Sequence, residues 1–145
     1  MRRTALALAI LAAILARSPA YGQEPNTNAG KLVSSSANVA ALTATATLAA
    51  ASGLMNYVCG ILVTGAGATA ASVIHPTLTG LNGGTINYTM AIVAGATLTQ
   101  PELKDAFYPC QPATALNTAI TLSVPSFGTG NTDTTVNIWG YRLPY

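Results

Sequence analysis

Few side chains in this 145-residue sequence could do acid–base, nucleophilic or metal chemistry. The sequence contains one histidine, His75, so a metal site built from several histidines is impossible. A catalytic triad would have to combine His75 with Asp105 or Asp133, but no Gly-x-Ser-x-Gly motif is present to hold a serine nucleophile. Glu102 and Asp105 lie beside Lys104 in one short segment, which is typical of a solvated loop rather than of paired catalytic carboxylates. We therefore predict no catalytic residue, no metal and no cofactor, and a protein that is not an enzyme.

A glycine-rich segment, residues 65–70, follows a hydrophobic stretch and is similar to the phosphate-binding turn of dinucleotide-binding folds. Dinucleotide binding by such a turn requires a helix that begins at the glycines, so that the helix N-terminus can bind the pyrophosphate. Pro76 stands inside the stretch that such a helix would occupy, and Val73 and Ile74 are poor helix formers. The segment therefore predicts a plain turn.

The two cysteines, Cys59 and Cys110, are the clearest candidates for covalent chemistry. An even cysteine count in an exported protein favours a disulfide. This bond would close a loop of about fifty residues and restrict the unfolded chain by roughly 4 kcal/mol. The alternative is a buried free thiol at Cys59 and an unrelated cysteine in a loop at Cys110.

Aromatic residues near the C-terminal end could form a binding surface. Tyr108, Trp139, Tyr141 and Tyr145 could together expose ring faces to a sugar. Trp139 and Tyr141 share one face of the last predicted strand, however, and can equally belong to the core. The triplet at residues 87–89 fits the acceptor pattern for N-glycosylation, but we interpret it as part of a strand.

Residues 1–22 have the three-part pattern of a secretory signal peptide: a basic start, an apolar run over residues 5–16 and small residues before the cleavage point. Cleavage before Gln23 fits best, and cleavage before Tyr21 is the second choice. The alternative is an N-terminal helix that stays attached and packs on a partner or anchors the protein in a membrane. The apolar run is shorter than the roughly 20 residues needed to cross a bilayer. We therefore expect an exported protein, periplasmic, extracellular or on a virion surface, without a stable membrane span once the signal-peptide helix is removed.

The charge balance excludes one class of partner. Three of the six basic residues lie in the first seventeen positions, so the rest of the chain has three basic and four acidic residues. Nucleic-acid binding depends on neutralising phosphates with clustered basic side chains. We therefore predict no nucleic-acid partner.

The elements that must position these residues are predicted to be short strands separated by turn residues. Threonine alternates with apolar residues over residues 42–48, which indicates a strand with its threonines on one face. The segment Leu81-Asn82-Gly83-Gly84 predicts a tight hairpin turn. Pro76 interrupts another strand and suggests an edge position or a bulge. The predicted strands cover residues 42–48, 54–64, 71–79, 85–93, 119–124 and 134–142.

Alternation also predicts which side chains are buried. In the strongest strand, residues 54–64, one face carries Met55, Tyr57, Cys59, Ile61 and Val63, and we expect it to face the core. The residues predicted to be buried overall are Tyr57, Ile61, Tyr88, Ile92, Leu122 and Ile138. In the proline-rich connection after Gly95, residues 102–107 are expected to form a single helical turn.

Short strands without long helical stretches predict an all-β fold, since parallel crossovers would need helices. We expect a single antiparallel β-sandwich, Ig-like or jelly-roll, of about six to eight strands. The predicted organisation is a signal peptide at residues 1–22, a flexible polar lead-in at 23–38 and the β-sandwich domain at 39–145.

Three segments, residues 56–64, 119–123 and 135–142 with its closing Gly-Tyr-Arg, resemble small β-sandwich accessory proteins encoded in the structural gene clusters of tailed phages and prophages. The resemblance covers residues 55–142. It implies a virion-surface or tail-associated module without enzymatic activity. The leader and the cysteine pair depart from that family pattern.

The leading functional hypothesis is therefore a non-enzymatic structural or adhesive module, phage-derived or virion-associated. Its expected partners are further copies of itself or a protein of the virion or cell surface. The alternative is an exported bacterial carbohydrate-binding or surface-adhesion module, for which the ligand would be a glycan.

Overall fold

The computed structural model of the protein describes residues 31–36, 38–95 and 102–144. The predicted signal peptide, most of the predicted lead-in and Tyr145 lie outside these residues. Within the described ranges every regular element is a β-strand, which confirms the all-β class. The strands are β1 Leu32–Ser35, β2 Ala44–Leu48, β3 Leu54–Ala66, β4 Ser72–Ile74, β5 Thr77–Leu81, β6 Gly84–Asn87, β7 Met90–Ile92, β8 Glu102–Pro112, β9 Ile120–Val124 and β10 Asp133–Pro144.

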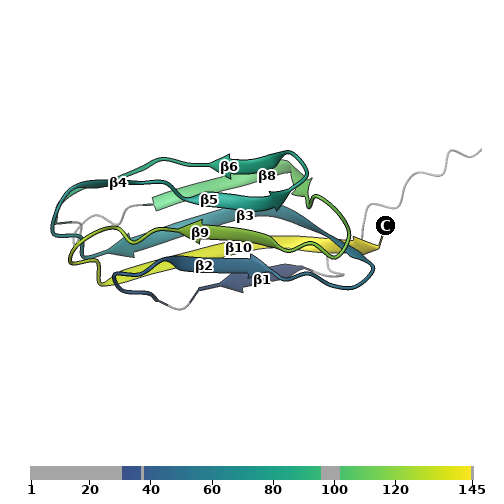
Figure 1. The fold of residues 1–145 in the computed structure, drawn as a ribbon, viewed down its shortest axis with the longest axis horizontal. Coiled ribbons are helices and arrows are strands. Elements are labelled where there is room, and N and C mark those ends of the chain that lie inside the picture. The colour runs from purple at the N-terminus through teal and green to yellow at the C-terminus, as the bar shows by residue number, and fades with distance from the viewer. Residues whose placement is uncertain (1–30, 37, 96–101, 145) are drawn as a thin grey trace, which may run out of the picture.

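The strands pair in a nested order: β1 with β10, β2 with β9, β3 with β8, β4 with β7 and β5 with β6. Two further pairings, β10 with β3 and β5 with β9, join these ribbons into two antiparallel four-stranded sheets. The first sheet has the order β1-β10-β3-β8 and the second has the order β2-β9-β5-β6, while β4 and β7 form a separate two-stranded ribbon. The two sheets overlie one another in Figure 1.

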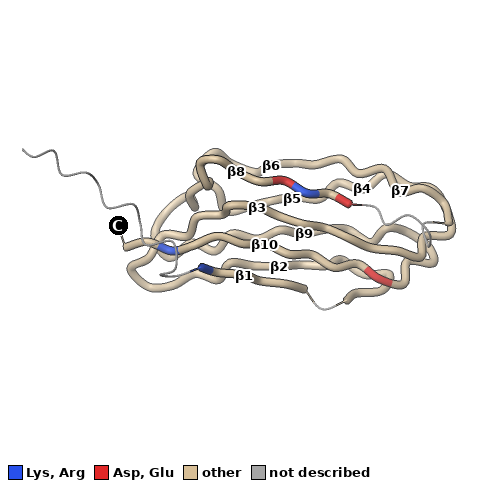
Figure 2. The backbone as a smooth tube through the Cα atoms, turned by 180° about the vertical axis from the view of Figure 1, so that it is seen from behind, with Lys and Arg blue, Asp and Glu red and all other residues tan. Residues whose placement is uncertain are grey.

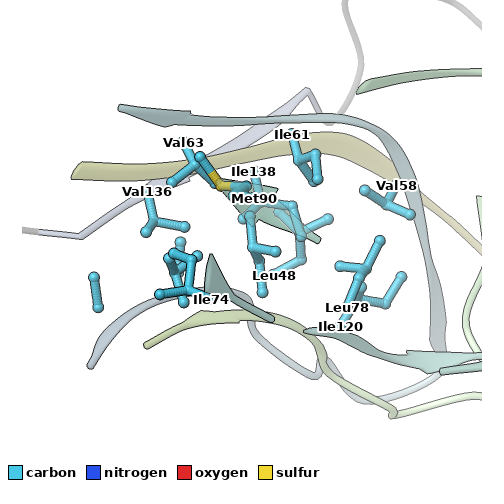
Figure 3. Packing of buried hydrophobic residues seen from close by; sticks show 14 of the residues in the cluster. Leu48, Val58, Ile61, Val63, Ile74, Leu78, Met90, Ile120, Val136 and Ile138 are labelled. Carbon is cyan, nitrogen blue, oxygen red and sulfur yellow. The ribbon is translucent and has the colours of Figure 1, made fainter. Parts of the chain in front are cut away.

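Buried apolar side chains from both sheets form one core between them (Figure 3). The first sheet contributes Val58, Ile61, Val63, Val136 and Ile138, and the second contributes Leu48, Leu78, Ile120 and Leu122. Of the residues predicted to be buried, Ile61, Ile92, Leu122 and Ile138 are confirmed. Tyr57 and Tyr88 are half-buried rather than buried, and of these two only Tyr88 packs against the core.

A bulge in β3 explains the error at Tyr57. In the ladder with β10, Gly60 pairs with Trp139 and Val58 pairs with Gly140, so Cys59 is an extra residue without a partner. An extra residue shifts the alternation by one position. Ile61 and Val63 therefore face the core as predicted, but before the bulge the buried residues are Asn56 and Val58 rather than Met55 and Tyr57.

Strand β8 replaces the helical turn predicted at residues 102–107. Its side chains alternate between exposed and half-buried, with Leu103 and Phe107 packed against the core and Glu102, Lys104 and Ala106 exposed. The local preference of Glu102 and Lys104 for helix is weak and is overridden by the pairing of β8 with β3.

The predicted hairpin turn is confirmed, the strand predicted across Pro76 is divided rather than bulged, and strand β1 was missed. Leu81 pairs with Gly84 across the predicted Asn82–Gly83 turn. Pro76 separates β4 from β5, as its lack of an N–H requires, and its carbonyl oxygen accepts a hydrogen bond from the backbone N of Tyr88 at 2.9 Å. Strand β1 lies inside the segment predicted as a flexible lead-in. The count therefore rises from about six to eight strands to ten, because β1 and β8 are added and two predicted strands are each divided.

Candidate functional site

The outer faces of the two sheets differ in chemistry. Strands β2, β5, β6 and β9 carry no charged residue, and the side chains that they turn away from the core are hydroxyl or carboxamide groups, Thr45, Thr47, Thr77, Thr79, Thr85, Asn87, Thr121 and Ser123. Every charged residue of the described part belongs to the first sheet or directly precedes it (Figure 2): Lys31, Glu102, Lys104, Asp105, Asp133 and Arg142. Of these, Asp105 and Arg142 bind Tyr88 and Asn56 on the inner side of the sheet. The outer face of the first sheet carries Glu102 and Lys104 together with aromatic residues and the cysteine pair, and it is the candidate site.

Two tyrosines form a stacked pair on this face. The register places Tyr57 of β3 opposite Tyr141 of β10, and their ring centroids are 4.9 Å apart with 14° between the ring planes. Burial, and secondarily the neighbouring Tyr57, raises the pKa of Tyr141 above its ordinary value. Tyr141 was predicted as a surface candidate, but Tyr57 was missed because the bulge was not foreseen.

Trp139 lies across a glycine of the neighbouring strand. A Cβ built on Gly60 would be 2.6 Å from Cε2 of Trp139 and 2.8 Å from the carbonyl oxygen of Asp105, so only glycine leaves room for the indole. Gly60 pairs with Trp139 on one side and with Ala106 on the other, and Val33 pairs with Trp139 from β1. These residues form one row across the first sheet, in which Val33 is 64% exposed and Trp139 is half-buried.

A disulfide holds a second bulge, in strand β8, beside this row. Residues 107–110 of β8 stand opposite the single extra residue Cys59 of β3, because Ala106 pairs with Gly60 and Gln111 pairs with Val58. Cys59 and Cys110 form a disulfide with their Cα atoms 4.3 Å apart. The structure therefore contains the bond that the cysteine count favoured, and not the alternative of two free thiols.

Tyr108 projects from the bulge and is fully exposed, at 102% of its reference area. The peptide bond between Tyr108 and Pro109 is cis, and Gln111 donates a hydrogen bond from Nε2 to the carbonyl oxygen of Pro109 at 2.9 Å. The disulfide and the ladder pairing at Ala106 and Gln111 thus fix the backbone on both sides of Tyr108.

The predicted surface residues Tyr108, Trp139 and Tyr141 all lie on the first sheet, whereas Tyr145 lies outside the described residues. Trp139 and Tyr141 are half-buried and do not belong to the buried core cluster, so the interpretation of these two as core residues was wrong. Gly60 was also missed. A glycine inside a strong strand often marks a bulge or a close approach, and this signal could have identified it.

The closing Gly-Tyr-Arg residues connect β10 to β3. A Cβ on Gly140 would be 2.9 Å from the carbonyl carbon of Tyr57, so the glycine permits a close approach of the two backbones. Tyr141 stacks on Tyr57, and Arg142 donates a hydrogen bond from Nε to Oδ1 of Asn56. These three residues therefore have structural roles at this junction.

The residues that could act in catalysis contact different partners. Asp105 accepts a hydrogen bond from the hydroxyl of Tyr88 at 2.9 Å, while His75 is exposed, with its Nδ1 3.4 Å from Oγ1 of Thr89. Asp133 lies at the start of β10. Among the described residues no group of three or more His, Cys, Asp or Glu side chains is placed to hold a metal ion. The glycine-rich segment begins in the last two residues of β3 and continues into an irregular connection to β4, where a Cβ on Gly67 would be 2.7 Å from the backbone N of Thr132.

The part of the chain that the structure describes contains no helix long and apolar enough to cross a membrane. No protein-family model, curated protein or solved structure shows significant similarity to this chain.

Proposed function

We propose that this protein is a non-enzymatic structural or adhesive module, phage-derived or virion-associated, that acts through the outer face of its first sheet. The observation that carries the proposal is the bulge of β8, which presents Tyr108 fully exposed on a backbone held by the Cys59–Cys110 disulfide. Tyrosine is among the residues that contribute most to binding at protein interfaces. A fixed backbone reduces the conformational entropy that such a contact would lose.

The strand order supports this proposal. We infer that the β1-β10-β3-β8 and β2-β9-β5-β6 sheets form a jelly roll rather than an Ig-like sandwich, because the strands pair in nested order between the two ends of the chain. Jelly rolls occur in viral capsid and lectin domains. This support is an analogy at the level of the fold, since function depends on the site.

The disulfide supports the exported state expected from residues 1–22, because disulfides persist in oxidising compartments. Outside the cell the disulfide would stay oxidised and would continue to hold the backbone around Tyr108. Both considerations agree with a protein that is displayed on a particle or cell surface.

One observation favours the alternative, an exported bacterial carbohydrate-binding or surface-adhesion module. Trp139 lies half-buried on the open face of the first sheet, in a row with the small residues Gly60 and Ala106. Both candidate functions would use the same face, and they differ in where the protein resides.

The test asks whether the protein is found on particles and whether Tyr108 is needed for its association. Mass spectrometry of particles purified from a culture that carries the gene should detect the chain, and portal, tail and lysis genes should lie nearby in the genome. Tyr108→Ala should retain the disulfide and the β-sheet circular dichroism but lose association with the particle or with other copies. Thr85→Ala, an exposed change on the second sheet, should associate as the wild type does. A chain that is absent from particles, monomeric and unchanged by Tyr108→Ala would contradict the proposal.

A further inference from the structure

We infer that the row Trp139–Gly60–Ala106 is a binding site for one pyranose ring of a neutral glycan. This inference rests on the proposed function, because it names a ligand for the same outer face of the first sheet. It does not depend on Tyr108 or on whether the protein resides on a virion or a cell.

The row forms a low shelf for a flat ligand. Trp139 belongs to β10, and its indole lies over Gly60 of β3. Because Gly60 has no side chain, the indole can lie close to the sheet. The next position in the row is Ala106 of β8, whose methyl group is exposed and short. Neighbouring strands are about 4.8 Å apart, so an indole that crosses one strand approaches the next. The apolar C–H groups of a sugar ring can stack against such an aromatic surface.

Hydrogen-bonding groups lie along one side of the shelf. The adjacent row of the register contains Ser35 of β1, Asn137 of β10, Leu62 of β3 and Lys104 of β8. Ser35 and Lys104 are exposed, and Asn137 is half-buried. A carboxamide can both donate and accept, and an ammonium group donates up to three hydrogen bonds, which suits the hydroxyl groups of a sugar.

The other side of the shelf is bounded by the stacked rings of Tyr57 and Tyr141 and by the Cys59–Cys110 disulfide. Tyr57 and Tyr141 cover each other's ring faces, so they can limit the position of a ligand but offer it little stacking area. Trp139 is therefore the residue of this face that is placed to stack on a sugar.

The chemistry of the face selects a neutral glycan over other ligands. Lys104 and Glu102 project from the same strand with opposite charges, so the face lacks the excess of positive charge that nucleic acid needs. Extended peptides add to sheet edges and peptide helices occupy grooves, whereas this row crosses the face of the sheet. A neutral ring that stacks on Trp139 and hydrogen-bonds to Ser35, Asn137 and Lys104 fits the observed arrangement.

Trp139 also provides the measurement, because it is the only tryptophan in the sequence. The full mature chain is first applied to an array of neutral hexose and N-acetylhexosamine glycans, and the highest-scoring free oligosaccharide is then titrated while tryptophan fluorescence is recorded. We expect saturable binding that changes the emission of Trp139.

Ala106→Arg tests the site without touching a buried residue, since the long side chain can lie across the indole and occupy the shelf. It should weaken binding by about tenfold or more. Thr85→Arg is the matched control, because it adds the same side chain to an exposed position of the second sheet, and its affinity should stay within about twofold of wild type.

Two results would overturn the glycan site: no neutral glycan that changes Trp139 emission, or equal binding by wild type and Ala106→Arg. If Tyr108→Ala abolishes association but no neutral glycan binds, the proposed function is retained and the glycan site fails. Glycan binding with no particle or self-association would reject the virion role and retain the glycan site.

Discussion

Arg142 of β10 donates a hydrogen bond from Nε to Oδ1 of Asn56 of β3 at 2.9 Å, at the position where the register places the two residues opposite each other. Asn56 is buried, and its Nδ2 donates to the carbonyl oxygens of Leu48, Ala49 and Thr118 at 3.2, 3.1 and 2.7 Å. Arg142 also donates to the carbonyl oxygen of Ala49. One buried carboxamide thus connects the two central strands of the first sheet to the loops that follow β2 and precede β9.

Replacing Asn56 with leucine should lower the free energy of unfolding by about 2–4 kcal/mol. The substitution removes the carboxamide and leaves three carbonyl oxygens and the Arg142 guanidinium with fewer hydrogen bonds. Urea denaturation followed by circular dichroism measures the loss. Asn87→Leu, at an exposed position of β6, is the control and should change stability by less than about 0.5 kcal/mol. Equal stability of the two variants would contradict the structural role of Asn56.

Removing the disulfide should lower stability by about 2–4 kcal/mol, because the bond restricts a loop of 51 residues in the unfolded chain. The double variant Cys59→Ala with Cys110→Ala avoids a new free thiol. Hydrogen exchange should increase first at residues 107–110, while β3 and β10 remain protected. Alkylation of the unfolded, unreduced wild type should label no thiol, and labelling of two thiols would show that the bond is absent from the protein.

Replacing Gly60 with alanine should displace Trp139, because the new Cβ would collide with the indole and with the carbonyl oxygen of Asp105. We expect a loss of about 1–3 kcal/mol and a red shift of tryptophan emission as the ring moves into water. Gly83→Ala is the matched control, since no atom lies within 4 Å of its added Cβ. An unchanged emission spectrum for Gly60→Ala would contradict the close approach.

Alkaline pH should destabilise the protein through Tyr88. Burial first, and then the hydrogen bond from its hydroxyl to Asp105 and the charge of that carboxylate, raise the pKa of Tyr88 above its ordinary value. Above about pH 10 the unfolded chain loses this proton while the folded chain keeps it, so stability falls as the pH rises. Below that pH the contribution is fully present.

Stability curves of wild type and Tyr88→Phe between neutral pH and pH 11 test this linkage. The variant should be less stable near neutral pH, because Asp105 loses a hydrogen-bond donor, but its stability should fall less steeply above about pH 10. Parallel curves for the two proteins would show that Tyr88 does not cause the alkaline loss.

Local signals in the sequence predicted the local features of the fold. The alternation of threonine and apolar residues gave the correct faces of β2, where Ala44, Ala46 and Leu48 are buried. The Asn82–Gly83 turn was correct because its backbone requirement is met within four residues. Features that depend on distant strands were not predicted: the bulge at Cys59, the strand at residues 102–112 and the order of the strands in the sheets.

Only part of the candidate site could be predicted, because the other part depends on the pairing of distant strands. Tyr108, Trp139 and Tyr141 could be identified by residue type alone. Tyr57 and Gly60 could not, because their roles depend on the register between β3 and β10, and a shift of one residue exchanges the two faces of a strand.

Because the strands pair in nested order, the length of chain between two paired strands differs greatly from pair to pair. The turn at Asn82–Gly83 closes β5 on β6, whereas β1 and β10 are separated by roughly 100 residues, a loop that is slow to close directly. If the pairs form in order from β5–β6 outward, each new pair closes only a short additional loop. Strand β10 is the most C-terminal strand of the described residues, yet it lies between β1 and β3 in the first sheet. During synthesis that sheet therefore lacks an inner strand until β10 emerges, so the first sheet is completed only after residues 133–144 have been made.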